Sequence, residues 1–212
     1  MGHGAKSERV AGLSGKVAVG RAEPALRTAS FNNQRAWERW LQAKHLSSPG
    51  IWLRLARKGS RRSSVTHAEA LDSALCYGWI DGQIRSQSAE TWLVKFTPRS
   101  PRSIWSKINR KKALALVRTG RMRAAGLAEI QRAKKDGRWG RAYDSPRTAT
   151  VPPDFEAALA RNPHAKAFFA ALESRNRYAI LWRLQTAKKA ETRARRIVGF
   201  VSMLERGEKL HP

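Results

Sequence analysis

The chain has 212 residues, 42% of them hydrophobic, and carries 42 Lys and Arg against 16 Asp and Glu, a formal net charge of +26. This hydrophobic content excludes wholesale disorder, and the length suits one substantial domain or two small ones. So large a positive charge favours an anionic partner, whether nucleic acid, an acidic membrane surface or a phosphorylated ligand. The alternative is that the charge reflects composition alone and is simply solvated.

Several other classes of protein are disfavoured by what the sequence lacks. Cys76 is the single cysteine, which excludes an intramolecular disulfide. No stretch approaches the roughly 18 apolar residues of a membrane span, and residues 10–19 lack a signal-peptide h-region, so we expect a cytoplasmic protein. The five histidines are scattered and no P-loop or Rossmann fingerprint is present, so we expect neither a metal nor a cofactor.

The N-terminal part of the chain is predicted to hold a tail, a helix and a strand. Residues 1–30 lack a periodic apolar pattern and are expected to form a disordered basic tail. A helix capped by Asn32 or Asn33 is expected to run to Lys44, because apolar residues recur there at helical spacing. After a Pro-Gly break, residues 51–58 alternate as a strand does.

The clearest helix in the sequence lies between Thr66 and Gly78. Thr66 and Glu69 have the spacing of a capping box, in which each side chain satisfies a backbone N–H group of the other residue. Gly78 stands where a helix commonly ends in a left-handed residue. Cys76 falls on this helix without a His or a second Cys nearby in sequence, which indicates a core position and not a reactive thiol.

Two strands are expected after this helix. Asp81-Gly82 has the composition of a turn, and the segments 83–85 and 91–97 follow it with strand-like alternation. With residues 51–58 they predict a small antiparallel or mixed sheet.

The rest of the chain is predicted to be helical. Two prolines keep the chain extended as far as Ser103, which is expected to cap a helix running to about Thr119, and a shorter helix is expected over 127–136. The predicted fold class is therefore α+β, with a small antiparallel or mixed sheet and covering helices, followed by a C-terminal helical bundle.

Four regions are expected along the chain. They are a disordered basic tail over 1–30, an α+β domain over 31–140, a Pro-containing linker over 141–153 and a helical C-terminal domain over 154–212.

Several motifs in this chain are long enough to be specific. They are Gly50–Ala56 with Lys58-Gly59, Ala70–Gly82, Phe96–Arg99 with Ser103–Ser106 and Asn109, Gly120–Met122 with Gly126, Asn176–Tyr178, Thr186–Lys189 and Thr192-Arg193. Through these motifs, residues 32–210 resemble the YdeI/OmpD-associated, or bacteriocin-protection, proteins of bacteria. The resemblance implies an association with stress or bacteriocin tolerance, and it implies no reaction and no cofactor.

The candidate site joins Asp81 to the segment that follows the last predicted strand. A helix beginning at Ser103 would present unpaired N–H groups and a partial positive charge, which suit an anion. The expected anion contacts are donors from this one segment, namely Arg99, Arg102, Ser103, Ser106 and Asn109. Asp81 is expected to orient one of the arginines, with Trp79 and Trp105 as structural supports. Alternatively, Ser103 only caps a helix and an arginine pairs with Asp81 to lock two loops together.

Three functions follow from these features. We expect a non-enzymatic protein of stress or bacteriocin tolerance that binds an anionic ligand or nucleic acid. The first alternative is an enzyme acting on a small phosphate- or carboxylate-bearing substrate with Asp81 as general base. The second is a protein-interaction module with a solvated basic surface. Seven of the eight tryptophans lie between residues 37 and 139 among basic residues, a weak indication of stacking platforms for single-stranded nucleic acid.

Overall fold

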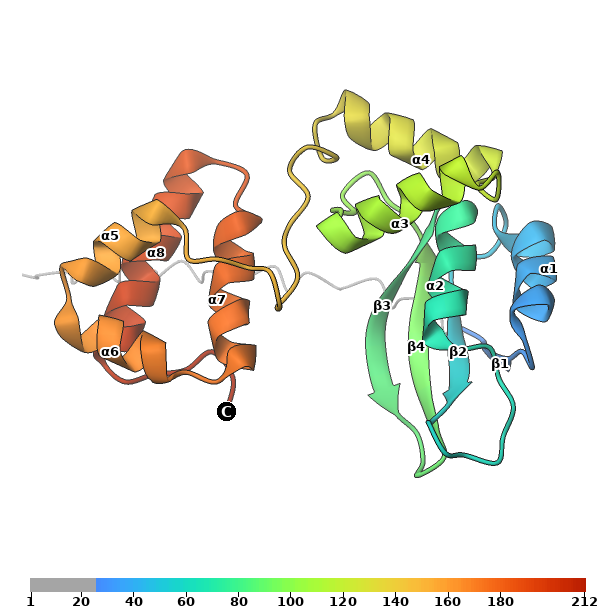
Figure 1. Ribbon diagram of the computed structural model, residues 1–212, viewed down its shortest axis with the longest axis horizontal. Helices are drawn as coiled ribbons and strands as arrows, with labels where there is room; N and C mark the ends of the chain where they lie inside the picture. Colours follow the sequence, from blue (N-terminus) through green and yellow to red (C-terminus); the bar gives the residue numbers. More distant parts are fainter. Residues whose placement is uncertain (1–25) are drawn as a thin grey trace, which may run out of the picture.

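Residues 26–212 of the computed structural model form four strands and eight helices (Figure 1). The first group of elements is β1 (Thr28–Ser30), α1 (Gln34–Lys44), β2 (Ile51–Ala56), α2 (His67–Cys76), β3 (Trp79–Ser86), β4 (Thr91–Pro98), α3 (Lys107–Arg118) and α4 (Ala124–Lys135). The second group, joined to the first by an extended segment, is α5 (Pro153–Ala160), α6 (Pro163–Ala171), α7 (Ser174–Gln185) and α8 (Ala190–Glu205). The predicted α+β class is confirmed, while the predicted domain boundaries stay predictions.

The four strands form one mixed sheet in the order β1-β2-β4-β3. β1 is parallel to β2, and the other two pairs are antiparallel. Leu53 of β2 lies opposite Val94 of β4, and both side chains are buried, as the alternation of both segments predicts. This inner face packs on helices α1 and α2, so one hydrophobic core joins the sheet to its helices.

The predicted disordered tail is wrong at its end. Residues 28–30 form β1, whose three residues pair with Trp52, Leu53 and Arg54 of β2. A strand of three residues is too short to show an apolar period in the sequence. It is ordered by hydrogen bonding to β2, a neighbour distant in sequence. Residues 1–25 of the predicted tail lie outside the described residues.

The predicted turn at Asp81-Gly82 is also wrong, because β3 begins at Trp79 and includes both residues. Asp81 lies opposite Phe96 of β4, and the pairing register then shifts between Asp81 and Ile84. The Asp-Gly pair therefore marks a bulge inside a strand, a place where a strand bends and a side chain is re-aimed.

The helix expected to begin at Ser103 begins at Lys107 instead. Its N-cap is Ser106, whose side chain accepts a hydrogen bond from the backbone N–H of Asn109 at 3.0 Å. Ser106 is fixed there by the chain beyond α4, because the N–H of Lys107 donates to the carbonyl of Tyr143 at 2.8 Å. Both serines are chemically suited to cap a helix, and the contact with Tyr143 selects the later one.

The helix α2 has the ends that its sequence predicts. Thr66 and Glu69 form the complete capping box, and Gly78 follows the helix with a φ of 74°, in the left-handed region. The first turn of α4 packs against the last turn of α2, where the N–H of Arg123 donates to the carbonyl of Cys76 at 3.1 Å. This contact holds the chain at the entrance to β3.

The second group of helices has a hydrophobic core of its own, centred on Phe155, Ile180 and Leu184. Asn162 caps α6 through its side chain, whereas the N-cap residue of α5 is Pro152 and Asp154 lies in the first turn of that helix. Among residues 26–212 no helix is long and apolar enough to span a bilayer.

Asp144 ties the segment after α4 to helix α7. Its carbonyl accepts a hydrogen bond from the Tyr178 hydroxyl at 2.8 Å, and its N–H donates to Gln185 Oε1 at 2.9 Å. Its carboxylate pairs with Lys107 of α3 at 2.8 Å. The two groups of elements therefore meet at this residue.

Candidate anion-binding site

The structure separates the side chains that the sequence suggests as anion contacts. Ser103 lies in a turn, where its hydroxyl accepts a hydrogen bond from the N–H of Ser100 at 2.9 Å. Ser106 is buried and occupied with capping, and Asn109 lies in the first turn of α3. Arg102 is exposed, whereas Arg99 is only 5% exposed. The predicted anion contacts stay predictions, but they do not share one helix N-terminus.

Arg99 is packed as a core residue. Its guanidinium lies 3.6 Å from the centre of the Trp105 ring, and Nη1 donates to the carbonyl of Ile104 at 3.3 Å. Its Nε and Nη2 groups have no hydrogen-bond partner among residues 26–212. Burial lowers the pKa of Arg99 to about 10, an effect that the nearby carboxylate of Glu129 opposes.

Asp81 pairs with a histidine and not with an arginine, which corrects the expectation from sequence. A hydrogen bond of 3.0 Å joins its Oδ2 to Nε2 of His67, the first residue of α2. The imidazole ring also lies 5.6 Å from the ring of Trp92, measured between centroids. Both side chains of the pair are partly exposed, at 33% for His67 and 25% for Asp81.

Tyr143 is a member of this neighbourhood that sequence reasoning missed. Its backbone pairs with Ser106 as an isolated parallel bridge. Burial raises the pKa of Tyr143, the charge of Asp81 adds to the rise and the charge of Arg99 opposes it. Asp81, Arg99 and Tyr143 are thus near enough to interact electrostatically, although they come from three separate segments.

Four of the eight tryptophans offer little exposed ring surface. Trp37, Trp79 and Trp105 are at most 2% exposed, and the Trp79 indole N–H donates to the carbonyl of His45 at 3.1 Å. Trp52 is 8% exposed, with the guanidinium of Arg85 4.2 Å from its ring centre. These rings support the core, and the structure shows no row of open stacking faces among them.

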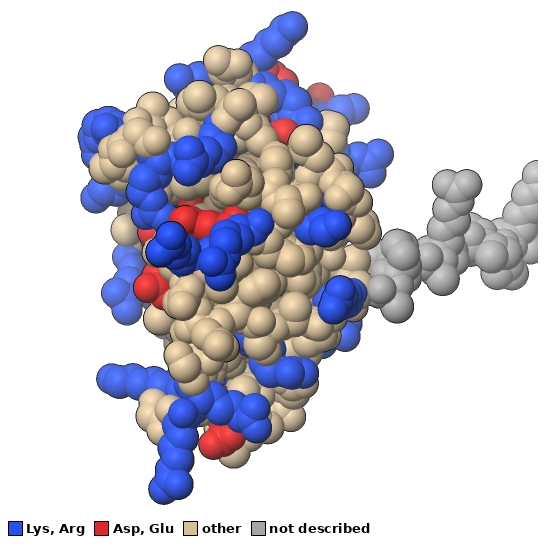
Figure 2. All heavy atoms as spheres, turned by 90° about the vertical axis from the view of Figure 1, so that its right-hand side faces the viewer, with Lys and Arg blue, Asp and Glu red and all other residues tan. Residues whose placement is uncertain are grey.

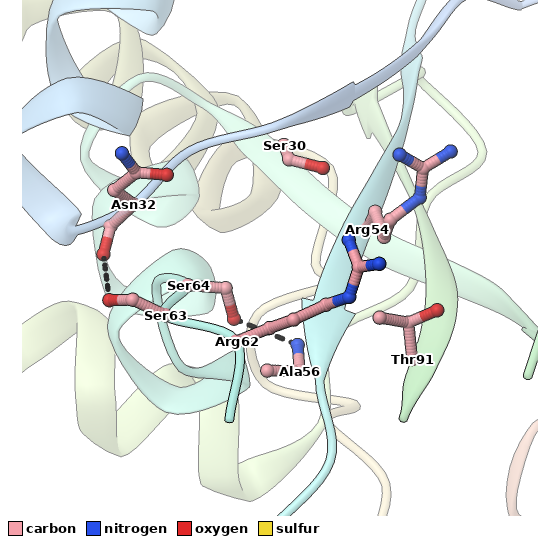
Figure 3. A pocket seen from close by; sticks show the side chains of 8 residues that line it. All are labelled: Ser30, Asn32, Arg54, Ala56, Arg62, Ser63, Ser64 and Thr91. Carbon is pink, nitrogen blue, oxygen red and sulfur yellow. Dashed lines mark hydrogen bonds between the residues drawn. The ribbon is translucent and has the colours of Figure 1, made fainter. Parts of the chain in front are cut away.

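A pocket of about 270 Å³ lies where β1, β2 and β4 meet the loop after β2 (Figure 3). It is lined by two arginines and a set of small, mostly polar residues, namely Ser30, Asn32, Arg54, Ala56, Arg62, Ser63, Ser64 and Thr91. Figure 3 shows the guanidinium groups of Arg54 and Arg62 on the same side of the pocket, over β2. Among residues 26–212, no carboxylate lines this pocket.

Neighbouring residues hold both arginines by their Nε groups. Arg54 Nε donates to Gln87 Oε1 at 2.8 Å, and Arg62 Nε donates to Glu90 Oε2 at 3.0 Å. The terminal Nη groups of both arginines make no hydrogen bond within the described part of the chain. Ser64 fixes the loop, because its hydroxyl accepts from the N–H of Ala56 at 2.8 Å. The pocket therefore offers two positioned forks of free donors.

The surroundings of the pocket are basic. Residues 57–65 carry four Lys or Arg and no carboxylate, and Glu90 forms an ion pair with Arg62 of this loop. Figure 2 views the molecule from the side of α1 and shows basic side chains grouped at the lower end, where this loop and the β3–β4 hairpin lie in Figure 1. The basic residues of this loop are adjacent in sequence, whereas Ser30 and Arg54 come beside the loop only through the pairing of β1 with β2.

Comparison with known proteins divides the chain into two matched segments. Residues 148–207 match the family described as Bacteriocin-protection, YdeI or OmpD-Associated. The C-terminal segment is therefore similar to that family. Residues 29–129 match a domain of unknown function, DUF8412. No curated protein and no solved structure matches the chain.

The resemblance inferred from sequence is thus confirmed for the C-terminal helices. The motifs quoted from the first half, such as Ala70–Gly82, fall within the match to the domain of unknown function. The Arg54–Arg62 pocket lies in that first segment, and so does the His67–Asp81 pair.

Proposed function

We propose that this chain is a binding protein that takes up the phosphate groups of nucleic acid at the Arg54–Arg62 pocket. The observation that carries the proposal is the pair of arginines with free terminal N–H groups in a pocket without a lining carboxylate. We also propose a role in stress or bacteriocin tolerance in the cytoplasm, and the match of the C-terminal segment to the bacteriocin-protection family supports the bacteriocin part of this proposal.

The geometry suits a phosphate for two reasons. A guanidinium group presents its N–H groups as a planar fork that matches two oxygens of a phosphate. The Nε contacts to Gln87 and Glu90 already orient both forks, so less side-chain entropy is lost on binding. The further cations of residues 57–62 can contact neighbouring phosphates along a strand.

A salt series tests this proposal. Fluorescence anisotropy with a labelled random single-stranded DNA should show affinity falling steeply with salt concentration. Arg54→Ala and Arg62→Ala should each weaken binding and reduce the slope of log K against log salt by about 0.7 per lost contact. Lys166→Ala, an equal charge change at an exposed position of α6, is the matched control and should leave the slope unchanged.

Removing a negative charge beside the pocket provides a second test in the same DNA-binding assay. Glu90→Gln removes the carboxylate that pairs with Arg62, so it should raise affinity by a few-fold at low salt. No DNA binding by the unaltered chain at low salt would reject the proposal and favour a protein-interaction module. Equal losses for Lys166→Ala and Arg62→Ala would reject the pocket as the site.

An enzyme with Asp81 as general base is the second candidate function. The 3.0 Å hydrogen bond to His67 supports an enzyme of modified form, in which the imidazole of His67 is the general base and the carboxylate of Asp81 orients it. Neither residue lines the Arg54–Arg62 pocket. Asp81→Asn should therefore leave DNA binding unchanged under the first proposal, and a loss of binding in a variant of normal stability would show that the two features form one site.

A further inference from the structure

A second, smaller pocket lies where the two groups of elements meet. Ile104, Arg138 and Arg141 line it from the first group, and Gln185, Thr186 and Lys188 line it from the end of α7 and the residues that follow. Its volume is about 30 Å³. It shares no residue with the Arg54–Arg62 pocket, so it is an independent feature of the chain.

Arg138 is the buried member of this junction pocket. It is 5% exposed, its Nε donates to both carboxylate oxygens of Asp136 at 2.9 and 2.8 Å, and its Nη1 donates to the carbonyl of Ser103 at 2.5 Å. Its Nη2 is buried without a partner in the described residues. A buried guanidinium N–H without an acceptor is costly, and such a group calls for a ligand or an ordered water.

The charges around the junction pocket favour an anion. Arg141 and Lys188 add two exposed cations to the buried one, and no carboxylate of the described part of the chain lines the pocket. Two acidic residues of the same segment are engaged in ion pairs, Asp136 with Arg138 and Asp144 with Lys107. The lining therefore has an uncompensated positive charge, contributed by both groups of elements.

We propose that the junction pocket binds one small tetrahedral oxyanion, inorganic phosphate or sulfate, between Arg138, Arg141 and Lys188. One water needs about 10–15 Å³ of a pocket measured in this way, so 30 Å³ suits an ion of a few heavy atoms and not a nucleotide. Because Lys188 follows α7 and the two arginines follow α4, the ion links the YdeI/OmpD-associated segment to the sheet-containing part of the chain.

Isothermal titration with inorganic phosphate at constant ionic strength tests this assignment. The titration uses the full chain with Arg62→Ala, so that phosphate uptake at the other pocket does not contribute. We expect a single site, competition by sulfate and none by chloride. Arg141→Ala and Lys188→Ala change exposed residues and should each weaken phosphate binding about threefold to fivefold, with Lys166→Ala as the control that leaves it unchanged.

Three results would overturn the assignment. One is an absence of phosphate binding in the Arg62→Ala chain, and another is unchanged binding in both the Arg141→Ala and Lys188→Ala variants. The third is equal binding of adenosine monophosphate through the same residues, which would show a larger ligand than the pocket volume allows. Failure of DNA binding at the Arg54–Arg62 pocket would leave this inference intact, because the two pockets are tested with different variants.

Discussion

Gly126 is the position where one added methyl group should have the largest effect on this fold. It lies in the first part of α4, where that helix packs against the last turn of α2. A Cβ atom at residue 126 would lie 2.5 Å from the carbonyl oxygen of Cys76 and 2.6 Å from that of Leu75, and it would also meet Met122 Sδ. The methionine side chain can move away, but the two backbone oxygens belong to a helix end.

The free-energy change for Gly126→Ala follows from two opposing effects. Alanine is favoured over glycine inside a helix by about 1 kcal/mol. Against this, overpacking costs about 1–3 kcal/mol, or more when backbone must move, and here α4 would have to shift away from α2. We expect a net loss of about 2 kcal/mol in the free energy of unfolding, which lowers the melting temperature by roughly 4–8 °C in a chain of this size.

Gly199→Ala is the matched control, because it is the same substitution inside helix α8 where an added Cβ meets nothing within 4 Å. It should stabilise the chain by about 0.5–1 kcal/mol. Urea unfolding followed by circular dichroism and tryptophan fluorescence measures both variants. A Gly126→Ala chain as stable as the unaltered one would refute the close contact between α2 and α4, and so would an equal loss in Gly199→Ala.

Two further predictions concern helix α2. Burial raises the pKa of the Cys76 thiol to about 11, so iodoacetamide should label it at pH 8 about 100-fold more slowly in the folded chain than in the unfolded one. The labelling rate of the folded chain should rise tenfold per pH unit towards pH 11. Fast labelling of the folded chain at pH 8 would contradict this prediction. Thr66→Ala should cost about 1 kcal/mol of unfolding free energy, against no change for Thr150→Ala at an exposed position. Hydrogen bonds from Thr66 lower the pKa of Glu69 in the folded chain. Their contribution to the free energy of unfolding is therefore complete above the unfolded pKa of Glu69 and is lost as the pH falls through the folded pKa. A Thr66→Ala effect that stays constant down to pH 2 would exclude that linkage.

The residues of the candidate sites are only partly predictable from the sequence. The basic loop at residues 57–62 is visible in sequence, but the pocket also needs Ser30 from β1 and Thr91 from β4, which only strand pairing brings there. His67 and Asp81 lie 14 residues apart and pair because β3 returns beside the helix that precedes it. Arg138 is a candidate ligand contact because it is buried where the two groups of elements meet, and no local sequence pattern predicts that burial.

The sequence by itself determined the features that depend on near neighbours. The capping box of Thr66 and Glu69, the left-handed Gly78 and the alternation that buries Val94 each require contacts only a few residues apart, so composition and spacing predict them. The tertiary structure decided which of two serines caps α3, which partner Asp81 takes and which arginine is buried. In each case several local arrangements are similar in free energy, and packing against a distant segment selects one of them.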